Sequence, residues 1–388
     1  MYISKVKVRN WRNFTDVEVS LEDTVFLIGP NASGKSNFLD IFRFLRDIAN
    51  PEGGGLQKAI SSRGGLKKIR SLAARRYTNV DLEIELNDAS STDGCLAEPD
   101  WKYVLSIKNE KSGKRRILVA KEEVYRDGER ILARPNDDDK RDPVRLTQTY
   151  IEQINMNNEF REITEFFQQV LYLHLIPQLL KFGGQVSIRE MESDPFGQGF
   201  LEHISATPSK PRDSRLKRIE ALLKEVIPFF RELRFVKDDI TGAPHLEMRY
   251  VHWRPRAGWQ REDQFSDGTL RLIALGWTLL SFNSLILLEE PEISLHTKIV
   301  EQIPELVSKW RKSRKKAGGQ ILISTHSESL LSGSSIDGGF LILKPGGKGA
   351  PTRITQPSED DRKALRSGMT PADILLPQTN NFIKNIPL

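Results

Sequence analysis

The stretch that decides the fold is GPNASGKSN, residues 29–37. It fits the pattern G-x-x-x-x-G-K-[ST], with Gly29, Gly34, Lys35 and Ser36 at the fixed positions. The apolar run directly before it predicts a strand, and the periodic segment after it predicts a helix. In that context the glycines let main-chain N–H groups approach a phosphate closely, because no side chain intervenes. The sequence therefore predicts a phosphate-binding loop in an α/β domain.

Each position of this loop has an expected role. Lys35 is predicted to reach the β- and γ-phosphates of ATP, and the Ser36 hydroxyl to bind Mg²⁺. The residues predicted to line the nucleotide are Gly29, Pro30, Asn31, Ala32, Ser33, Gly34, Lys35, Ser36 and Asn37.

A pair of carboxylates follows a second apolar run, in SLILLEEPEISLH at residues 284–296. Four apolar residues end in Glu289 and Glu290, and Pro291 stops the strand. The carboxyl ends of parallel strands are where α/β proteins bind ligands. Because successive strand residues face opposite sides, the two glutamates can do different work. We expect Glu289 to hold Mg²⁺ and Glu290 to orient the attacking water.

Two further motifs fit the same centre. QILISTHSESLL, residues 320–331, predicts a buried strand that ends at His326, and a histidine there can contact the γ-phosphate. FSDGTLRLIALG, residues 265–276, is a polar turn that opens onto an apolar helix. A helix start carries unpaired N–H groups and partial positive charge, so the turn that contains Ser266 and Gly268 suits an anion.

Composition limits the class of protein. The 388 residues are 38% hydrophobic and 28% charged, which is typical of a folded globular chain. No apolar run reaches the roughly 18–20 residues that span a bilayer, and the N-terminus lacks a signal-peptide core. The single cysteine, Cys95, excludes an internal disulfide and a thiolate zinc site. These features predict a cytoplasmic protein with no membrane partner and no zinc.

The net charge of +6 leaves two interpretations open. Lysines and arginines gather at residues 63–76, 108–121, 210–218 and 309–316. These patches are either solvated faces or a footprint for a phosphate backbone, which needs only clustered cations. Composition alone does not choose between them.

The chain is predicted to fall into three parts. Residues 1–147 alternate with period two around the phosphate loop, which predicts three strands, a helix and an antiparallel β meander. The meander is expected to include hairpin turns at KSGK and RDGE and a further strand at PVRLTQTY. Residues 148–236 are predicted to form a helical insertion. Residues 237–388 alternate helix and strand, which favours an α/β fold with a mixed or parallel core sheet.

The order of the four motifs resembles that of the ABC-type ATPases of the SMC, RecF and OLD group, often called AAA-family ATP-binding proteins. The resemblance implies that two copies enclose two ATP molecules. Ser266 and Gly268 of one copy would then bind the γ-phosphate of ATP held by the other. Glu289 and Glu290 fall on the Walker B pair and His326 on the switch histidine. The implied state is a homodimer or a larger homo-oligomer.

The sequence departs from this family at the signature turn and at Walker B. The signature reads Ser-Asp-Gly-Thr rather than Ser-Gly-Gly-Gln, and Asp267 adds negative charge near a phosphate. Glu289 stands where relatives usually have aspartate. His296 falls where many relatives have the D-loop aspartate.

The sequence does not settle which glutamine would complete the Mg²⁺ site. Gln178, after an apolar segment, is the first choice for the Q-loop, and Gln148 is the alternative. Arg12 is a candidate for contact with the nucleotide.

The resemblance leaves several functions open. The first is a nucleotide-switched ATPase associated with DNA, in repair or phage defence, with a separately encoded nuclease or effector. The acids in NDDDK, residues 136–140, are expected to form a solvated turn, and the chain ends too soon after its last core strand for a TOPRIM nuclease domain. The second is a scaffold that binds ATP with negligible turnover and sequesters an effector. The third is the ATPase subunit of a transporter.

Overall fold

The computed structural model describes residues 1–88, 98–110, 116–176, 180, 199–251, 258–282, 284–312, 319–333, 338–347 and 350–379. Within these ranges no helix has both the length and the apolar character needed to cross a membrane.

The strands are β1 (Tyr2–Trp11), β2 (Phe14–Ser20), β3 (Thr24–Ile28), β4 (Val80–Asn87), β5 (Trp101–Asn109), β6 (Ile117–Arg126), β7 (Glu129–Arg134), β8 (Leu171–Leu173), β9 (Phe230–Lys237), β10 (Pro244–Tyr250), β11 (Gln260–Arg261), β12 (Ile286–Glu289), β13 (Ile321–Thr325), β14 (Gly339–Lys344) and β15 (Arg353–Thr355). The α-helices are α1 (Lys35–Ala49), α2 (Leu56–Ser61), α3 (Leu66–Ile69), α4 (Asp137–Arg141), α5 (Arg161–Gln168), α7 (Phe200–Ala206), α8 (Ser209–Val226), α9 (Asp267–Ser281), α10 (Thr297–Val300), α11 (Ile303–Lys312), α12 (Glu328–Ser332), α13 (Glu359–Arg366) and α14 (Pro371–Leu375). Short 3-10 helices are η1 (Pro143–Thr147), η2 (Asn158–Phe160) and η4 (Glu262–Gln264).

Strands from distant parts of the chain form the core sheet, in the order β15-β14-β3-β13-β12-β8. All neighbours in it are parallel except β14 and β15. Its residues alternate between two hydrophobic clusters. Phe26 and Ile28 pack in the cluster that includes α9, whereas Leu27 between them packs in the cluster that includes α1. This alternation explains why β3 is apolar at successive positions, because helices cover both faces of the sheet.

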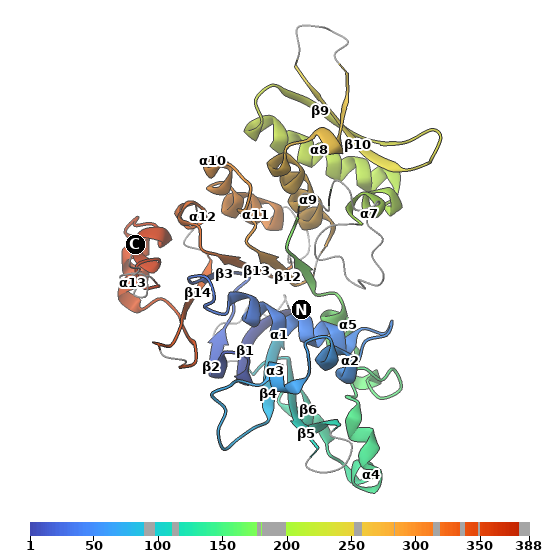
Figure 1. The fold of residues 1–388 in the computed structure, drawn as a ribbon, viewed down its shortest axis with the longest axis vertical. Helices are drawn as coiled ribbons and strands as arrows, with labels where there is room; N and C mark the ends of the chain where they lie inside the picture. The colour runs from blue at the N-terminus through green and yellow to red at the C-terminus, as the bar shows by residue number, and fades with distance from the viewer. Residues whose placement is uncertain are drawn as a thin grey trace.

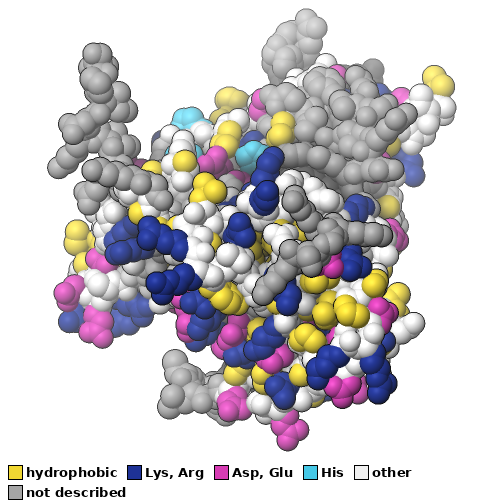
Figure 2. Space-filling view, turned by 60° about the horizontal axis from the view of Figure 1, so that its bottom comes forward, with side chains coloured by type: hydrophobic (Ala, Val, Ile, Leu, Met, Phe, Trp, Pro, Cys, Tyr) yellow, Lys and Arg dark blue, Asp and Glu magenta, His cyan; other side chains and the backbone are white. Residues whose placement is uncertain are grey.

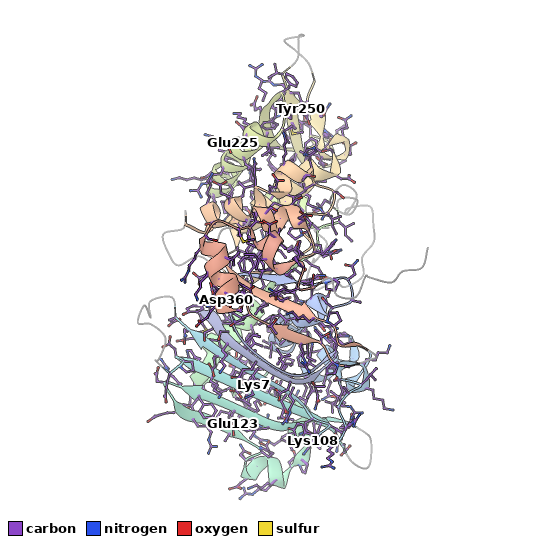
Figure 3. All side chains as sticks on the ribbon, turned by 90° about the vertical axis from the view of Figure 1, so that its left-hand side faces the viewer. Lys7, Lys108, Glu123, Glu225, Tyr250 and Asp360 are labelled. Carbon is purple, nitrogen blue, oxygen red and sulfur yellow. The ribbon has the colours of Figure 1, made fainter. Side chains whose placement is uncertain are left out.

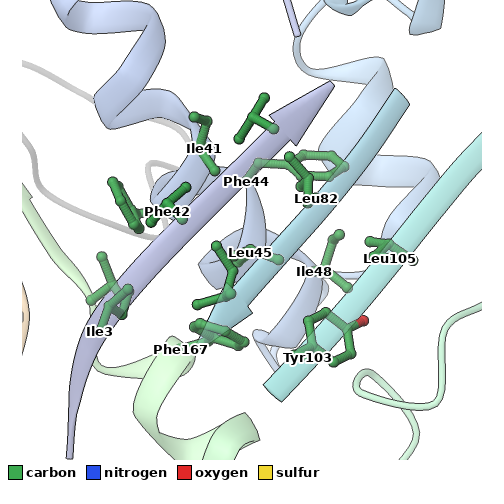
Figure 4. Close-up of a cluster of buried hydrophobic side chains, with 14 of the residues drawn as sticks. Ile3, Ile41, Phe42, Phe44, Leu45, Ile48, Leu82, Tyr103, Leu105 and Phe167 are labelled. Atoms are coloured by element: carbon green, nitrogen blue, oxygen red, sulfur yellow. The ribbon is translucent and has the colours of Figure 1, made fainter. Parts of the chain in front are cut away.

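The antiparallel meander forms a second sheet below the core sheet, in the order β2-β1-β4-β5-β6-β7. Helix α1 lies between the two sheets. In Figure 4 its side chains Phe44, Leu45 and Ile48 point toward Leu82 of β4 and Tyr103 of β5. The phosphate loop at the start of α1 is therefore fixed by a helix with ten of its fifteen residues buried.

The other face of this second sheet is charged. Along β1 and β4, buried residues alternate with intermediate or exposed ones, as expected for a sheet that is half-buried. Figure 3 shows this sheet in the lower half of the molecule, with Lys7 and Glu123 labelled on it.

A smaller unit contains α7, α8 and the sheet β11-β10-β9; α8, β9 and β10 lie above α9 and α7 lies beside it (Figure 1). Leu223 of α8 and Met248 of β10 are fully buried in the same cluster as Trp277 of α9. The signature helix α9 is therefore covered by this unit on one side and by the core sheet on the other.

Three expectations need correction. PVRLTQTY does not form a strand: Pro143–Thr147 is the 3-10 helix η1, and Asp142 accepts a hydrogen bond from Val144 N at its start. The acids of NDDDK lie in helix α4 rather than in a turn. Residues 148–236 are not helical throughout, because β8 joins the core sheet and β9 pairs with β10. The RDGE hairpin turn is confirmed between β6 and β7, whereas KSGK lies outside the described residues.

Candidate functional site

The phosphate loop connects β3 to α1 through a backbone that requires glycine. Gly34 precedes α1 with φ 101°, and a Cβ there would lie 2.1 Å from Nδ2 of Asn13. A Cβ on Gly29 would lie 2.5 Å from the Ser33 hydroxyl and 2.9 Å from the Leu343 carbonyl oxygen. Both glycines are therefore fixed by close approach of neighbouring atoms, as the motif predicts.

Lys35 is buried and hydrogen-bonded to the loop itself. Its Nζ donates to the carbonyls of Gly29 at 2.8 Å and Pro30 at 3.2 Å. Burial lowers the pKa of Lys35, and the nearby carboxylates of Glu290, Glu292 and Glu289 oppose that shift. The first turn of α1 contains no acidic residue, and no side chain caps it. The N–H groups of this helix start are therefore suited to an anion.

Strand register brings the remaining motifs to the same edge. Glu289 pairs with Ser324 across β12 and β13, and Thr325 pairs with Ile28 across β13 and β3. The carboxyl ends of β3, β13 and β12 therefore meet beside Lys35, the position where this class of sheet binds ligands.

Glu289 accepts hydrogen bonds from two side chains. The Ser36 hydroxyl donates to its Oε1 and the Tyr172 hydroxyl to its Oε2. Ser36 and Glu289 supply adjacent hard oxygen donors, the ligands that Mg²⁺ prefers. The two residues predicted to bind the metal are thus in direct contact.

Glu290 lies on the other side of the strand end and contacts the predicted switch histidine. Nδ1 of His326 is 3.1 Å from Oε1 of Glu290. Glu290 has φ 45°, an uncommon conformation for a residue with a side chain. Its main chain is fixed on both sides, because its N–H donates to Ser324 O at 3.0 Å and its carbonyl accepts from Arg271 at 3.4 Å. The strained peptide points the carboxylate toward His326.

The signature turn is ordered within the chain. The Ser266 side chain accepts a hydrogen bond from Thr269 N at 3.2 Å and so caps α9. A Cβ on Gly268 would lie 2.9 Å from the Ser294 carbonyl oxygen and 3.4 Å from a methyl of Leu295. Within the described residues, no hydrogen bond or ion pair joins Ser266 or Gly268 to the phosphate loop of the same chain.

Four residues that sequence reasoning missed support this centre. The Asn13 amide donates to Ser33 O at 3.0 Å and accepts from Asn37 at 2.8 Å, so it braces the phosphate loop. Glu292 is buried and accepts from Thr325 at 2.6 Å, and its other oxygen has no hydrogen-bond partner in the described structure. The other two, Tyr172 and Arg271, contact Glu289 and Glu290. Asn13 and Tyr172 lie outside the quoted motifs, whereas Glu292 and Arg271 lie within SLILLEEPEISLH and FSDGTLRLIALG, where only their contacts with other segments show their roles.

The weaker candidates have other roles or fall outside the description. Gln178 lies outside the described residues. Gln148, the alternative, belongs to another cluster: its carbonyl accepts from Arg134 at 2.8 Å. The Arg12 guanidinium binds Asp40 at 2.7 Å, and His296 caps α10 by accepting from Lys298 N at 3.3 Å.

The acids of NDDDK are structural. Asn136 and Asp139 form a capping box at the start of α4, and Asp139 is paired with Arg134 at 2.8 Å. In the part of the chain that the structure describes, no group of three or more histidine, cysteine or acidic side chains could hold a metal ion by itself.

The chain is similar to known proteins. The sequence profile of a family described as "AAA domain, putative AbiEii toxin, Type IV TA system" matches residues 25–332. Among curated proteins, DNA replication and repair protein RecF of a Synechocystis species is 33% identical over 88 residues, which is 22% of this chain and 23% of that RecF. RecF of Bacillus cytotoxicus is 30% identical over 88 residues, 22% of this chain and 24% of that protein. The chain thus matches about a quarter of the length of these relatives.

Among solved structures, an SMC head bound to the C-winged-helix domain of ScpA has a TM-score of 0.53 and 14% identity, and covers 94% of this chain and 100% of the SMC head chain. At that identity the likeness shows the fold alone. The chain therefore belongs to the AAA-domain family whose profile spans residues 25–332, and it has the head fold of the ABC-type ATPases of the SMC and RecF group.

Proposed function

We propose that the chain binds ATP with Mg²⁺ and hydrolyses it, and that two copies close on the nucleotides as a switch. The observation that carries this proposal is the convergence of Lys35, Ser36, Glu289, Glu290 and His326 at one edge of the core sheet. Family membership supports ATP binding, and the contact of Ser36 with Glu289 fits a Mg²⁺ site.

The roles follow from chemistry. Bound Mg²⁺, held by Ser36 and Glu289, supplies charge neutralisation for the phosphates. Lys35 exchanges the carbonyls of Gly29 and Pro30 for phosphate oxygens, which restores a favourable partner for its buried charge. Phosphoryl transfer then needs stabilised charge and an aligned water more than covalent help from the protein.

Glu290 is the residue that orients the water. Its carboxylate is partly exposed, beside His326, and is not used as a partner by Ser36 or Tyr172. His326 positions Glu290 and contacts the γ-phosphate, so it can respond when that phosphate leaves.

A second copy completes the site. Ser266 and Gly268 start a helix of fifteen residues and have no hydrogen bond to the phosphate loop of their own chain among the described residues. Its capped, ordered N-terminus would bind the γ-phosphate held by the partner, because a helix start favours anions. ATP then favours the closed pair through its higher affinity for that state.

DNA is the proposed partner of a basic loop beside the site. Residues 62–80 contain six lysines and arginines and no acid. Asn10 holds this segment at two places: its carbonyl accepts from Ser71 N at 2.9 Å, and its amide donates to Tyr77 O at 3.0 Å and Asn79 O at 2.8 Å. Leu72, which lies between Ser71 and Tyr77, is fully exposed. Figure 2 shows lysine and arginine side chains in several groups over one face of the molecule. Such clusters suit a phosphate backbone of any sequence.

A separately encoded effector, such as a nuclease, would couple this ATP-dependent switch to DNA repair or phage defence. The support is indirect: the similar SMC head was solved with a domain of another protein, and RecF acts in DNA replication and repair by its name.

A scaffold with negligible turnover is the second candidate. The observation that favours it is Asp267 in the first turn of α9, because negative charge opposes phosphate binding there.

Turnover of the wild type and of Glu290→Gln, each with and without duplex DNA, tests the proposal. We expect ATP binding to persist and turnover to fall by about 10²–10⁴-fold in Glu290→Gln, as for loss of a general base. Light scattering should show Glu290→Gln dimerising with ATP. Glu305→Gln, a matched change at an exposed glutamate paired with Lys309, should behave as the wild type.

Equal, near-zero turnover of wild type and Glu290→Gln would favour the scaffold. Equal turnover at a substantial rate would show that Glu290 is not the residue that orients water. Turnover by a species that stays monomeric at saturating ATP would rule out the shared site.

A further inference from the structure

We propose that Tyr172 is a positioning residue that fixes the carboxylate of Glu289 for metal binding through its hydroxyl group. This inference rests on the proposed ATP and Mg²⁺ site and adds a residue to it. No motif contains Tyr172: it lies on the three-residue strand β8, more than a hundred positions before Glu289.

Strand register sets the geometry. Strand β8 runs parallel to β12, with Tyr172 opposite Leu287. Paired residues on neighbouring strands point to the same face, and so do residues two apart on one strand. Tyr172, Leu287 and Glu289 therefore face the side of α1, where Ser36 also lies. The tyrosine ring, one position below the strand end, is long enough to reach Glu289.

The contacts divide the carboxylate between two donors. Ser36 donates to Oε1 and Tyr172 to Oε2, so neither oxygen is left to rotate freely. Helix α1 holds the tyrosine from its other side, because the Arg43 guanidinium lies 4.0 Å from the ring centroid. Arg43 follows Ser36 by two helical turns, so the same helix face carries the metal-binding hydroxyl and the cation above the ring.

The hydroxyl of Tyr172 is largely shielded from solvent. Tyr172 is 7% exposed, so water competes little for the carboxylate.

The need for such a residue follows from the length of Glu289. At the first Walker B position, glutamate has one more rotatable side-chain bond than the aspartate that relatives usually have there. The extra bond lets the carboxylate occupy more positions. Residues that orient metal ligands typically change metal affinity or activity by about 10–100-fold when they are removed. Tyr172 compensates for the extra methylene by fixing the end of the longer side chain.

The test measures metal dependence of nucleotide binding without hydrolysis. In the Glu290→Gln background, binding of a fluorescent ATP analogue is titrated with Mg²⁺, and Mn²⁺ binding is followed by electron paramagnetic resonance. We expect Tyr172→Phe, which keeps the ring over Arg43, to raise the half-saturating metal concentration about 10-fold. Binding of the nucleotide without metal should not change.

Tyr103→Phe is the matched control. Tyr103, like Tyr172, is a buried tyrosine whose hydroxyl donates to a glutamate, Glu122 at 3.1 Å, but it lies in the second sheet. We expect this variant to leave the metal dependence unchanged. Thermal unfolding of both variants separates a loss of folding from a loss of positioning.

A double-mutant cycle with Glu289→Asp identifies the route of the effect. The shorter aspartate does not reach the tyrosine hydroxyl, so Tyr172→Phe should change the half-saturating concentration less than about 2-fold in that background. An effect that persists in full would show that Tyr172 acts through packing and would overturn the inference. So would a Tyr172→Phe protein with the metal dependence of its parent. If the parent itself binds nucleotide without any metal dependence, the proposed function fails as well.

Discussion

Two groups of charged side chains in this molecule have opposite designs. Arg134 of β7, Glu122 of β6 and Asp139 of α4 are fully buried, and we call them the closed cluster. Arg134 donates to both acids and to two main-chain carbonyls. Glu122 also accepts from Tyr150 N and from the Tyr103 hydroxyl. Every side chain in the closed cluster has its partners within the fold.

The second group, which we call the open centre, is Lys35, Glu289, Glu290 and Glu292 at the edge of the core sheet. It contains three carboxylates to one lysine, and the lysine hydrogen-bonds only main-chain oxygens. Buried oxygens of Glu292, Ser33 and Ser324 have no hydrogen-bond partner in the described structure. In the closed cluster, the paired charges and hydrogen bonds stabilise the fold. In the open centre, the excess of carboxylates suits a cation, and the unsatisfied polar atoms are free to bind a ligand.

The largest expected effect comes from a substitution in the open centre. Lys35→Met should lower ATP turnover by about 10³-fold, because a preorganised donor to the transferring phosphate is lost. The free energy of unfolding should fall by less than in Arg134→Met, since Lys35 hydrogen-bonds only main-chain oxygens and its neighbours Glu289 and Glu290 are partly exposed. Turnover and chemical unfolding are measured together, with Lys102→Met, at a lysine paired with Glu83 on the second sheet, as the control. Equal losses in both variants would contradict the assignment.

The second prediction concerns a substitution that removes the cation of the closed cluster. Arg134→Met should lower the free energy of unfolding by about 3–5 kcal/mol, because it leaves two buried carboxylates without their cation. Turnover per folded molecule should stay near that of the wild type, measured at a temperature where both proteins are folded. A loss of turnover without a loss of stability would mean that the closed cluster has a catalytic role.

The third prediction uses pH. Burial would raise the pKa of Asp139, but hydrogen bonds from Arg134 and Asn136 N overcome it, and the pKa lies below its ordinary value. The stability from this group is therefore present above the unfolded pKa, near 3.8, and is lost as the pH falls through the folded pKa. Asp139→Asn should cost about 2 kcal/mol at pH 7 and progressively less below about pH 4. Urea unfolding across pH checks this, and a difference that grows in acid would refute it.

The smallest expected effect comes from alanine substitutions at two glycines that both have positive φ. Gly34→Ala should weaken ATP binding about 10-fold, because an alanine at φ 101° is strained and meets Asn13. Gly65→Ala is the matched control: φ is 92° there, but a Cβ meets nothing within 4 Å. It should lower stability by about 1 kcal/mol and leave ATP binding unchanged. Equal weakening of ATP binding in both would mean that strain alone, and not the contact with Asn13, matters.

The sequence predicts the open centre better than the closed cluster. The phosphate loop, the paired glutamates and the histidine each lie in a short motif at the end of an apolar strand, so local pattern and chemistry identify them together. Their mutual contacts follow from one rule, that the ends of parallel strands meet at a common edge.

The residues that sequence reasoning missed are fixed by distant pairing. Strand β8 is too short to stand out, and its contact with β12 joins segments more than a hundred residues apart. Arg271 resembles any arginine on a helix until its donors are seen on the carbonyls of Leu175 and Glu290. Asp139 sits in an acidic run that favours a solvated turn, and only the arginine on β7 makes it a buried partner.

The side-chain amide of Asn13 links the phosphate loop to a segment that is synthesised much later. Asn13 donates both to Ser33 O in the phosphate loop and to the Thr352 hydroxyl, and Thr352 N donates back to Asn13 O at 2.9 Å. The loop near the start of the chain is thus braced by a residue made more than three hundred codons later. A nascent chain still lacking that residue has the whole motif but not its support.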